Sequence, residues 1–212
     1  MTDRAGEVVV VETGVANVAS VDAALRRAGA EVRHANDPAA IRDAAAVVLP
    51  GVGTLRAGMQ RLTESGAAEA LRARIAGDLP TLCVCLGMQL LFDSSDESPG
   101  VEGLGLARGH AGRFPAGVRT PQFGWNRVEP DAPDSVLSAG YAYFANSFRV
   151  VDAPEGWAVA TADHGGRFVA AMRRGRVVAC QFHPELSGPY GRSIIDAWLN
   201  AAGLASSGAV AC

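Results

Sequence analysis

The sequence predicts a doubly wound α/β fold, with a mostly parallel sheet flanked by helices and an antiparallel β-rich second half. The run Val8 to Val11 is the first indication, because a strand covered on both faces shows continuous branched residues rather than alternation. The second indication is the alternation of apolar runs with helical patterns over residues 8–92. The third is a series of short β-rich pieces after residue 140, separated by glycine, proline and aspartate.

In the first half, each strand is followed by a helical segment. Val8 to Val11 is the first strand, and residues 17–28 form a helix with apolar residues at three- and four-residue spacings, ended by Gly29. Asp37-Pro38 is typical of an N-cap followed by proline at the first helical position. The remaining strands are expected at residues 31–34, 46–49 and 81–84, and two further helices at residues 55–62 and 67–75.

In the second half, the predicted strands are residues 141–144, 157–161, 168–172 and 177–182. Arg173-Arg174-Gly175-Arg176 indicates a tight turn between the last two, so we expect an antiparallel pair that joins the sheet at one edge. Residues 191–200 predict a closing helix. We expect a single domain over residues 1–204 and a mobile tail over residues 205–212.

Composition and charge exclude several classes of protein. The 212 residues are 49% hydrophobic and 19% charged, as in an ordinary soluble domain. A net charge of −3 lacks the basic excess that nucleic-acid binding requires. The apolar run Val8 to Val11 is far shorter than the roughly 20 residues that span a bilayer, and we expect no membrane or targeting segment. Four cysteines, two of them one residue apart, are typical of reduced thiols in the cytoplasm.

The segment around Cys85 has the layout of a nucleophile elbow. The strand at residues 81–84 passes directly into a helical pattern at residues 86–92, with Cys85 at the junction and Gly87 two residues later. The positive end of that helix would favour the thiolate, and the backbone N–H of Leu86 is expected to be free to bind an oxyanion. A buried structural cysteine is the alternative interpretation of this segment taken alone.

A base for this thiol is predicted at His183. It directly follows an apolar strand, so it should emerge at the carboxyl edge of the sheet, and Glu185 can accept from its second imidazole nitrogen. The other histidines have no comparable partner spacing and are expected to be surface or hydrogen-bonded structural residues: His34, His110 and His164.

A glycine-containing loop, Pro50-Gly51-Val52-Gly53-Thr54, follows the strand at residues 46–49. Its glycines allow the backbone to turn N–H groups into the crevice where open α/β sheets bind ligands. An ordinary turn between strand and helix is the alternative. This loop, Cys85 and His183 lie at the ends of three predicted strands, so we expect them to converge on one crevice.

These segments resemble the class I (triad) glutamine amidotransferases, over nearly the whole chain, and among them the glutaminase subunits of imidazole glycerol phosphate synthases. The similarity is carried by residues 50–53, 85–92, 101–106, 121–126 and 181–185, of which Gly124-Trp125-Asn126 is the most specific to that subfamily. The resemblance implies that Cys85 is the nucleophile, His183 the general acid and base, and Glu185 its orienting partner. It further implies that Gly51, Val52 and Gly53 form an oxyanion loop beside Leu86. Gln89 and Glu97 would hold the glutamine substrate. The resemblance implies no metal and no cofactor.

The chain departs from the family pattern at several positions. Cys83 stands where relatives commonly have glycine, and its side chain is expected to relax the elbow slightly. Glu12-Thr13-Gly14 replaces aspartate-tyrosine-glycine at the end of the first strand, while Asn17 still matches. Asn146 replaces a usual histidine, and Leu186 replaces a usual lysine near the synthase interface of relatives. These differences spare the catalytic residue types and bear on partner docking.

The resemblance implies hydrolysis of glutamine to glutamate and ammonia through a cysteine thioester. The ammonia would pass to a (β/α)₈ cyclase subunit in a heterodimer, which makes imidazole glycerol phosphate and aminoimidazole carboxamide ribotide in histidine biosynthesis. Three alternatives stay open: a paralogous glutaminase that serves a different synthase, a non-catalytic scaffold, and a structural zinc module with the ligands Cys83, Cys85, Cys180 and His183.

Overall fold

The computed structural model describes residues 7–12 and 18–204 of the chain. The predicted mobile tail, the match at Asn17 and the difference at Thr13-Gly14 lie outside these residues. A nine-stranded sheet forms the centre of the molecule, in the order β2-β1-β3-β4-β12-β11-β10-β7-β8. Its strands are β1 (Glu7–Val11), β2 (Glu31–Ala35), β3 (Ala46–Leu49), β4 (Thr81–Val84), β7 (Gln122–Pro130), β8 (Gly140–Asn146), β10 (Ala158–Asp163), β11 (Arg167–Arg174) and β12 (Val177–Cys180).

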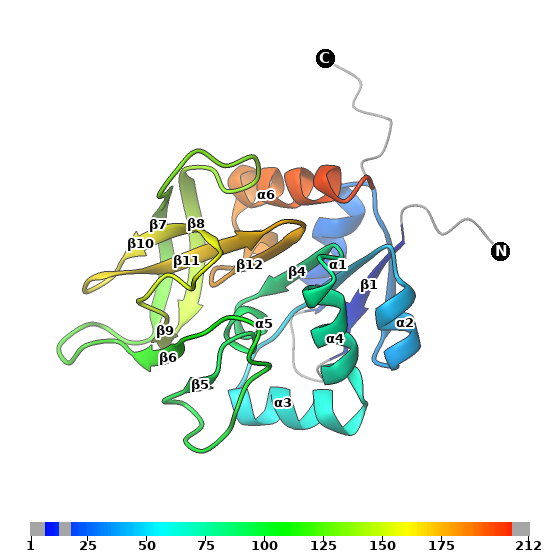
Figure 1. Cartoon of the computed structure of the whole chain (residues 1–212). Helices are drawn as coiled ribbons and strands as arrows, with labels where there is room; N and C mark the ends of the chain where they lie inside the picture. Colours follow the sequence, from blue (N-terminus) through cyan, green and yellow to red (C-terminus); the bar gives the residue numbers. More distant parts are fainter. Residues whose placement is uncertain (1–6, 13–17, 205–212) are drawn as a thin grey trace, which may run out of the picture.

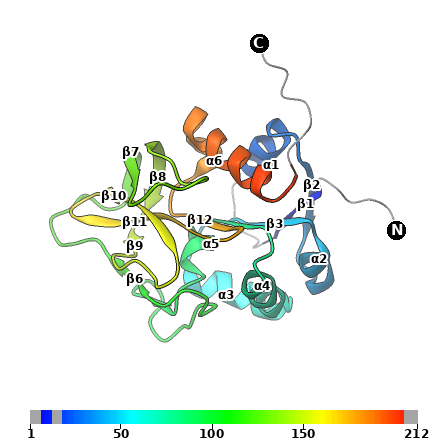
Figure 2. The same ribbon diagram turned by 45° about the horizontal axis from the view of Figure 1, so that its top comes forward.

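The parallel part of the sheet comprises β1, β2, β3, β4 and β12, as the doubly wound prediction requires. Helices α1 (Val18–Arg27) and α6 (Gly188–Ala201) cover one face, and α2 (Pro38–Asp43), α3 (Leu55–Glu64) and α4 (Ala67–Ala76) cover the other (Figures 1 and 2). Val9 and Val11 pack in the apolar cluster beneath α2 to α4, and Val8 and Val10 in the cluster beneath α1 and α6. Both faces of β1 are therefore buried, which explains its unbroken run of valines.

The antiparallel part extends the sheet beyond β12. β11 and β12 form the predicted pair around the turn at Gly175, but β12 lies inside the sheet beside β4, so the expectation of a pair at the sheet edge is wrong. The reason is that β10, β7 and β8 add further antiparallel strands outside β11. A small second sheet is formed by β5 (Ser94–Ser95), β6 (His110–Arg113) and β9 (Phe148–Arg149).

The strand β7 is an element that the sequence did not predict. Its aromatic residues Phe123 and Trp125 are 68% and 59% exposed. The apolar residues that alternate along this strand therefore face solvent rather than the core. A strand that exposes its aromatic face lacks the pattern on which strand prediction depends. Among residues 18–204, no helix combines the length and apolarity needed to cross a membrane.

Candidate active site

A cavity of about 180 Å³ lies at the carboxyl ends of β3, β4 and β12. The sequence-predicted site residues converge on it. Its lining includes Val52, Gly53, Cys85, Leu86, Gln89, Glu97 and His183, together with the segment Ala145 to Phe148. Of the predicted residues, Gly51 and Glu185 lie behind this lining, where each contacts a residue that does face the cavity.

Cys85 occupies the elbow between β4 and the helix α5 (Leu86–Gln89). Its φ of 54° and ψ of −109° depart from the ordinary regions for a residue with a side chain, as a nucleophile elbow requires. The backbone N–H of Cys85 donates to the carbonyl oxygen of Cys180 at 2.7 Å, which ties the turn to β12. Gly87 is required as well, since a Cβ there would collide with the carbonyl oxygen of Leu49.

The helix after the elbow is shorter than predicted. The sequence indicated a helix over residues 86–92, whereas α5 ends at Gln89. The carbonyl oxygens of Leu90 and Leu91 accept hydrogen bonds from the loop at residues 104–107, and this loop takes the place of further helical turns. Few aligned peptides therefore stand behind Cys85, so the positive end of α5 is weaker than that of the longer helix the sequence predicted.

Cys83 is fully buried on the other side of the sheet from Cys85. It packs in the apolar cluster beneath α2 to α4, whereas Cys85 belongs to the cluster beneath α1 and α6. Burial raises the pKa of the Cys83 thiol to about 12. Cys83 therefore lacks the exposure and the thiolate character of a nucleophile.

His183 and Glu185 are joined by a hydrogen bond of 2.8 Å between Nδ1 and Oε1. The short helix η1 (Pro184–Leu186) brings them together, and the two side chains are 9% and 4% exposed. Burial alone lowers the pKa of His183, but hydrogen bonds to Cys85 and to Glu185, and the charges of both, raise it to about 10. The raised pKa favours the imidazolium form of His183.

The oxyanion loop adopts an arrangement that the sequence did not predict. The backbone N–H of Leu86 donates to the carbonyl oxygen of Gly51 at 3.3 Å. The expectation of a free N–H at Leu86 is therefore wrong for this conformation, because the carbonyl of Gly51 occupies the donor. Gly53, with a φ of 99°, follows in a backbone region that residues with side chains rarely adopt.

The predicted substrate-binding residues face the same cavity from two directions. Gln89 is held by hydrogen bonds from its Nε2 to the Oε1 of Gln181 at 2.8 Å and to the carbonyl oxygen of Phe148 at 3.4 Å. Glu97 accepts from the backbone N–H of Leu55 at 3.1 Å. Burial raises the pKa of Glu97, although this hydrogen bond and the charge of Arg113 act in the opposite direction.

Sequence reasoning missed two buried amides of the site. Asn146 lines the cavity and donates from Nδ2 to the carbonyl oxygen of Phe148 at 3.0 Å; the sequence had marked it only as a departure from the family. Gln181 lies beneath the cavity, with its Nε2 3.8 Å from the Sγ of Cys85. The sequence signal that could have identified Gln181 is its position two residues before His183.

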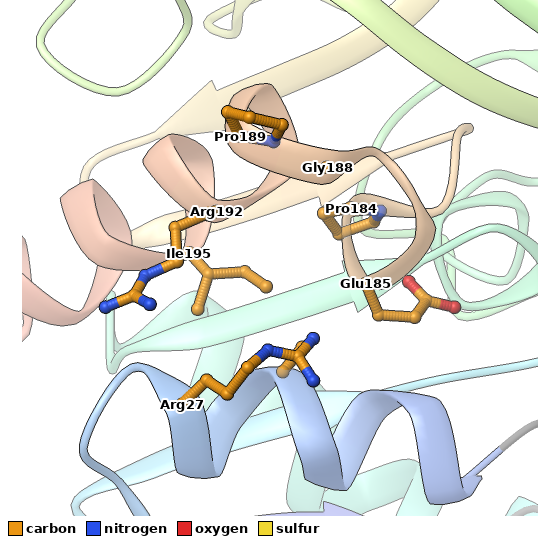
Figure 3. Close-up of a pocket in the computed structure, with 8 residues that line it drawn as sticks. Arg27, Pro184, Glu185, Gly188, Pro189, Arg192 and Ile195 are labelled. Carbon is orange, nitrogen blue, oxygen red and sulfur yellow. The ribbon is translucent and has the colours of Figure 1, made fainter.

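The remaining candidate clusters do not form a second catalytic centre. Within the part of the chain that the structure describes, no group of three or more histidine, cysteine, aspartate or glutamate residues can hold a metal, which contradicts the zinc module. His34 and His110 bind Asp22 and Asp96 at 2.9 and 3.0 Å. Another cavity, of about 260 Å³, lies between α1 and α6 behind Pro184 and Glu185 (Figure 3), but neither Cys85 nor His183 reaches it.

Comparison with known proteins gives four consistent matches. The family model described as glutamine amidotransferase class-I matches residues 9–201. The imidazole glycerol phosphate synthase subunit HisH of Symbiobacterium thermophilum is 41% identical over 196 residues, covering 90% of this chain and 92% of the relative. The chloroplastic imidazole glycerol phosphate synthase hisHF of Arabidopsis thaliana is 39% identical over 200 residues, covering 91% of this chain and 34% of that longer protein. A crystal structure of a glutamine amidotransferase shares the fold, with a TM-score of 0.74 at 22% identity over 92% of this chain and 98% of the other.

Proposed function

Because the chain belongs to the glutamine amidotransferase class-I family, we propose that it hydrolyses glutamine to glutamate and ammonia as the glutaminase subunit of an imidazole glycerol phosphate synthase. One observation carries the chemistry: Cys85, at a positive-φ elbow, shares a cavity with His183, and a hydrogen bond between them helps to raise the pKa of His183. Identity of 41% to a HisH subunit over most of both chains supports the choice of synthase.

The first half of the reaction transfers the acyl group to the enzyme. The thiolate of Cys85 forms a bond to the amide carbon of glutamine, and the amide oxygen takes up the negative charge. His183, held by Glu185 at 2.8 Å, donates its proton to the nitrogen as the carbon–nitrogen bond breaks. Ammonia leaves and a thioester to Cys85 remains.

The second half releases glutamate. His183, now neutral, takes a proton from a water molecule whose oxygen bonds to the thioester carbon. The carbon–sulfur bond breaks, so the thiolate of Cys85 is restored beside the imidazolium. In both halves, we assign Gln89 and Glu97 to hold the amino-acid end of glutamine, with the carboxylate of Glu97 near its α-ammonium group. No metal or cofactor takes part in this scheme.

The oxyanion donors of the proposal are the backbone N–H groups of Leu86 and of the loop Gly51 to Gly53. The N–H of Leu86 becomes available when the peptide carbonyl of Gly51 turns away from it. This rotation is the conformational step that we assign to activation.

The proposed partner is a (β/α)₈ cyclase, in a heterodimer, to which ammonia passes without release to water. The face of β7 beside the cavity supports a docking surface: Phe123 and Trp125 are largely exposed there, and Phe123 is paired with Ala145, which lines the cavity. Large exposed aromatic residues are typical of interface hot spots.

The described cysteines are buried free thiols, in keeping with the cytoplasmic location that belongs to this proposal.

The test measures glutamate release with the cyclase and its nucleotide ligand present. We expect activity in the wild type and none in Cys85→Ala, whereas equal activity in the two would overturn the proposal.

A glutaminase that serves a different synthase is the second candidate, favoured by Asn146 in the cavity lining and by the 38% exposed Leu186. Restoration of histidine-independent growth in a strain lacking the subunit would exclude it.

A further inference from the structure

The side chain of Gln181 lies directly beneath the nucleophile. Gln181 follows β12, its backbone N–H donates to the carbonyl oxygen of Ala170 at 2.8 Å, and its side chain is completely buried. The preceding residue, Cys180, holds the backbone N–H of Cys85. One short stretch of chain thus anchors the elbow and places an amide 3.8 Å from the Sγ of Cys85.

The direction of the Gln181 amide follows from its neighbours. The carbonyl oxygen of Phe148 can only accept, so the amide nitrogen of Gln89 must face it. The same nitrogen donates to the Oε1 of Gln181 at 2.8 Å. The nitrogen of Gln181 is therefore directed toward the sulfur of Cys85, as a donor.

Burial makes this contact stronger than its length suggests. A buried amide that lost its partner would be costly, and a hydrogen bond from an N–H group to an ionised acceptor is about twice as strong as one between neutral groups. Gln181 has no exposed surface, and among the residues that the structure describes its amide nitrogen donates to the sulfur of Cys85. His183 lines the same cavity as Cys85, so the imidazole and the Gln181 amide both lie near the sulfur.

We propose that Gln181 is a catalytic residue, whose side-chain N–H donates to the Cys85 sulfur and stabilises the thiolate before glutamine is attacked. The inference rests on the proposed function, and it adds a donor to the Cys85, His183 and Glu185 set. Through its Oε1, Gln181 also holds Gln89, which connects the nucleophile to the proposed substrate-binding residues.

The test is the rate at which iodoacetamide alkylates Cys85, because this reaction requires the thiolate but neither glutamine nor a partner. Gln181→Met keeps the length of the side chain and removes the N–H donor. We expect alkylation to slow about tenfold or more, the loss typical of a hydrogen bond to a charged group. Mass spectrometry of peptides separates the Cys85 signal from that of the other cysteines.

A matched control is Gln122→Met, which makes the same change at a buried amide on β7. It should alkylate as the wild type does. Thermal unfolding of each variant shows whether it is folded. Folded Gln181→Met that reacts at the wild-type rate would overturn the proposal.

A second variant, Gln181→Glu, keeps an acceptor for Gln89, so it separates the support of Gln89 from donation to the sulfur. Its carboxyl group donates only while protonated and repels the thiolate once ionised. We expect its alkylation rate, relative to wild type, to fall progressively as the pH rises. A constant ratio would contradict the proposal. Failure of wild-type Cys85 to be alkylated would instead overturn the proposed function itself.

Discussion

The carbonyl oxygen of Gly51 accepts a hydrogen bond from the backbone N–H of Leu86 at 3.3 Å. The donor that follows the nucleophile is therefore paired within the protein. An oxyanion formed on a carbon attached to Cys85 can use this donor only after the Gly51 peptide has rotated. The position suits such a rotation, because Gly51 and Gly53 carry no side chains of their own and Gly53 adopts a positive φ.

We expect the isolated chain to hydrolyse glutamine about 10²- to 10³-fold more slowly than the chain bound to its synthase partner, because one oxyanion donor contributes a factor of this size. The measurement is glutamate release at saturating glutamine, with and without the partner. Alkylation of Cys85 by iodoacetamide forms no oxyanion and should proceed at similar rates in the two states. Full activity of the isolated chain would show that the Gly51 carbonyl does not restrain the reaction.

The raised pKa of His183 predicts how the stability of the protein depends on pH. Burial lowers it, but the hydrogen bonds to Cys85 and Glu185 raise it to about 10. Glu185→Gln removes one of these causes, so the pKa of His183 measured by NMR titration should fall below the wild-type value. A group whose pKa is higher in the folded state stabilises the protein fully below about pH 6.5, its unfolded pKa, and ceases to do so as pH rises through the folded value.

The stability gap between wild type and Glu185→Gln should accordingly shrink as the pH rises from about 6.5 to about 10. Urea unfolding at several pH values measures this gap. Glu129→Gln, at a 60% exposed carboxylate on β7, is the control and should show no comparable trend. A gap that widens with pH would contradict the assignment of the ion pair.

The elbow should not tolerate a side chain at Gly87. A Cβ there would collide with the carbonyl oxygen of Leu49, a backbone atom of β3 that cannot move without displacing the strand. We expect Gly87→Ala to lower glutaminase activity by at least about 10²-fold, because small displacements of catalytic groups have effects of this size. Steady-state kinetics on folded protein, with near-ultraviolet circular dichroism as the check of folding, makes the measurement.

Gly58→Ala provides the matched comparison. Gly58 lies inside α3, and the nearest atoms to its added Cβ would be flexible methyl groups of Leu90 and Leu86, at 3.2 to 3.4 Å. Alanine is the better helix former, by about 1 kcal/mol. Activity close to wild type is expected for this variant, and equal losses in both variants would remove the special role of Gly87.

Trp125 should carry much of the affinity for the partner. Its indole is 59% exposed on β7, and its ring stands edge-on to Tyr143 with centroids 6.2 Å apart, which holds it in place. Trp125→Ala should weaken the complex by about 2 kcal/mol, or about 30-fold in Kd, as at an interface hot spot. Isothermal titration calorimetry measures the affinity, and Glu64→Ala on α3 is the control. An unchanged Kd would place the interface elsewhere.

The parallel half of the fold could be read from the sequence because its patterns are local. Val8 to Val11 indicated a strand buried on both faces, and Asp37 with Pro38 indicated where α2 begins; the structure confirms both. β7 escaped prediction because Phe123 and Trp125 face solvent, so its apolar alternation does not report a core. The early end of α5 was not predicted, because hydrogen bonds from residues 104–107 end the helix and no local sequence pattern indicates these bonds.

By itself the sequence determined the strand-to-helix units, the elbow at Cys85 and the pairing of His183 with Glu185, since each depends on residues close together in the chain. Only the tertiary structure decided which partners these groups meet across long separations. It brought the amide of Gln181 to the sulfur of Cys85 and the carbonyl of Gly51 to the N–H of Leu86. The physical reason is that hydrogen bonds between segments depend on strand order and loop conformation, which arise from packing of the whole chain and not from the spacing of residues within one segment.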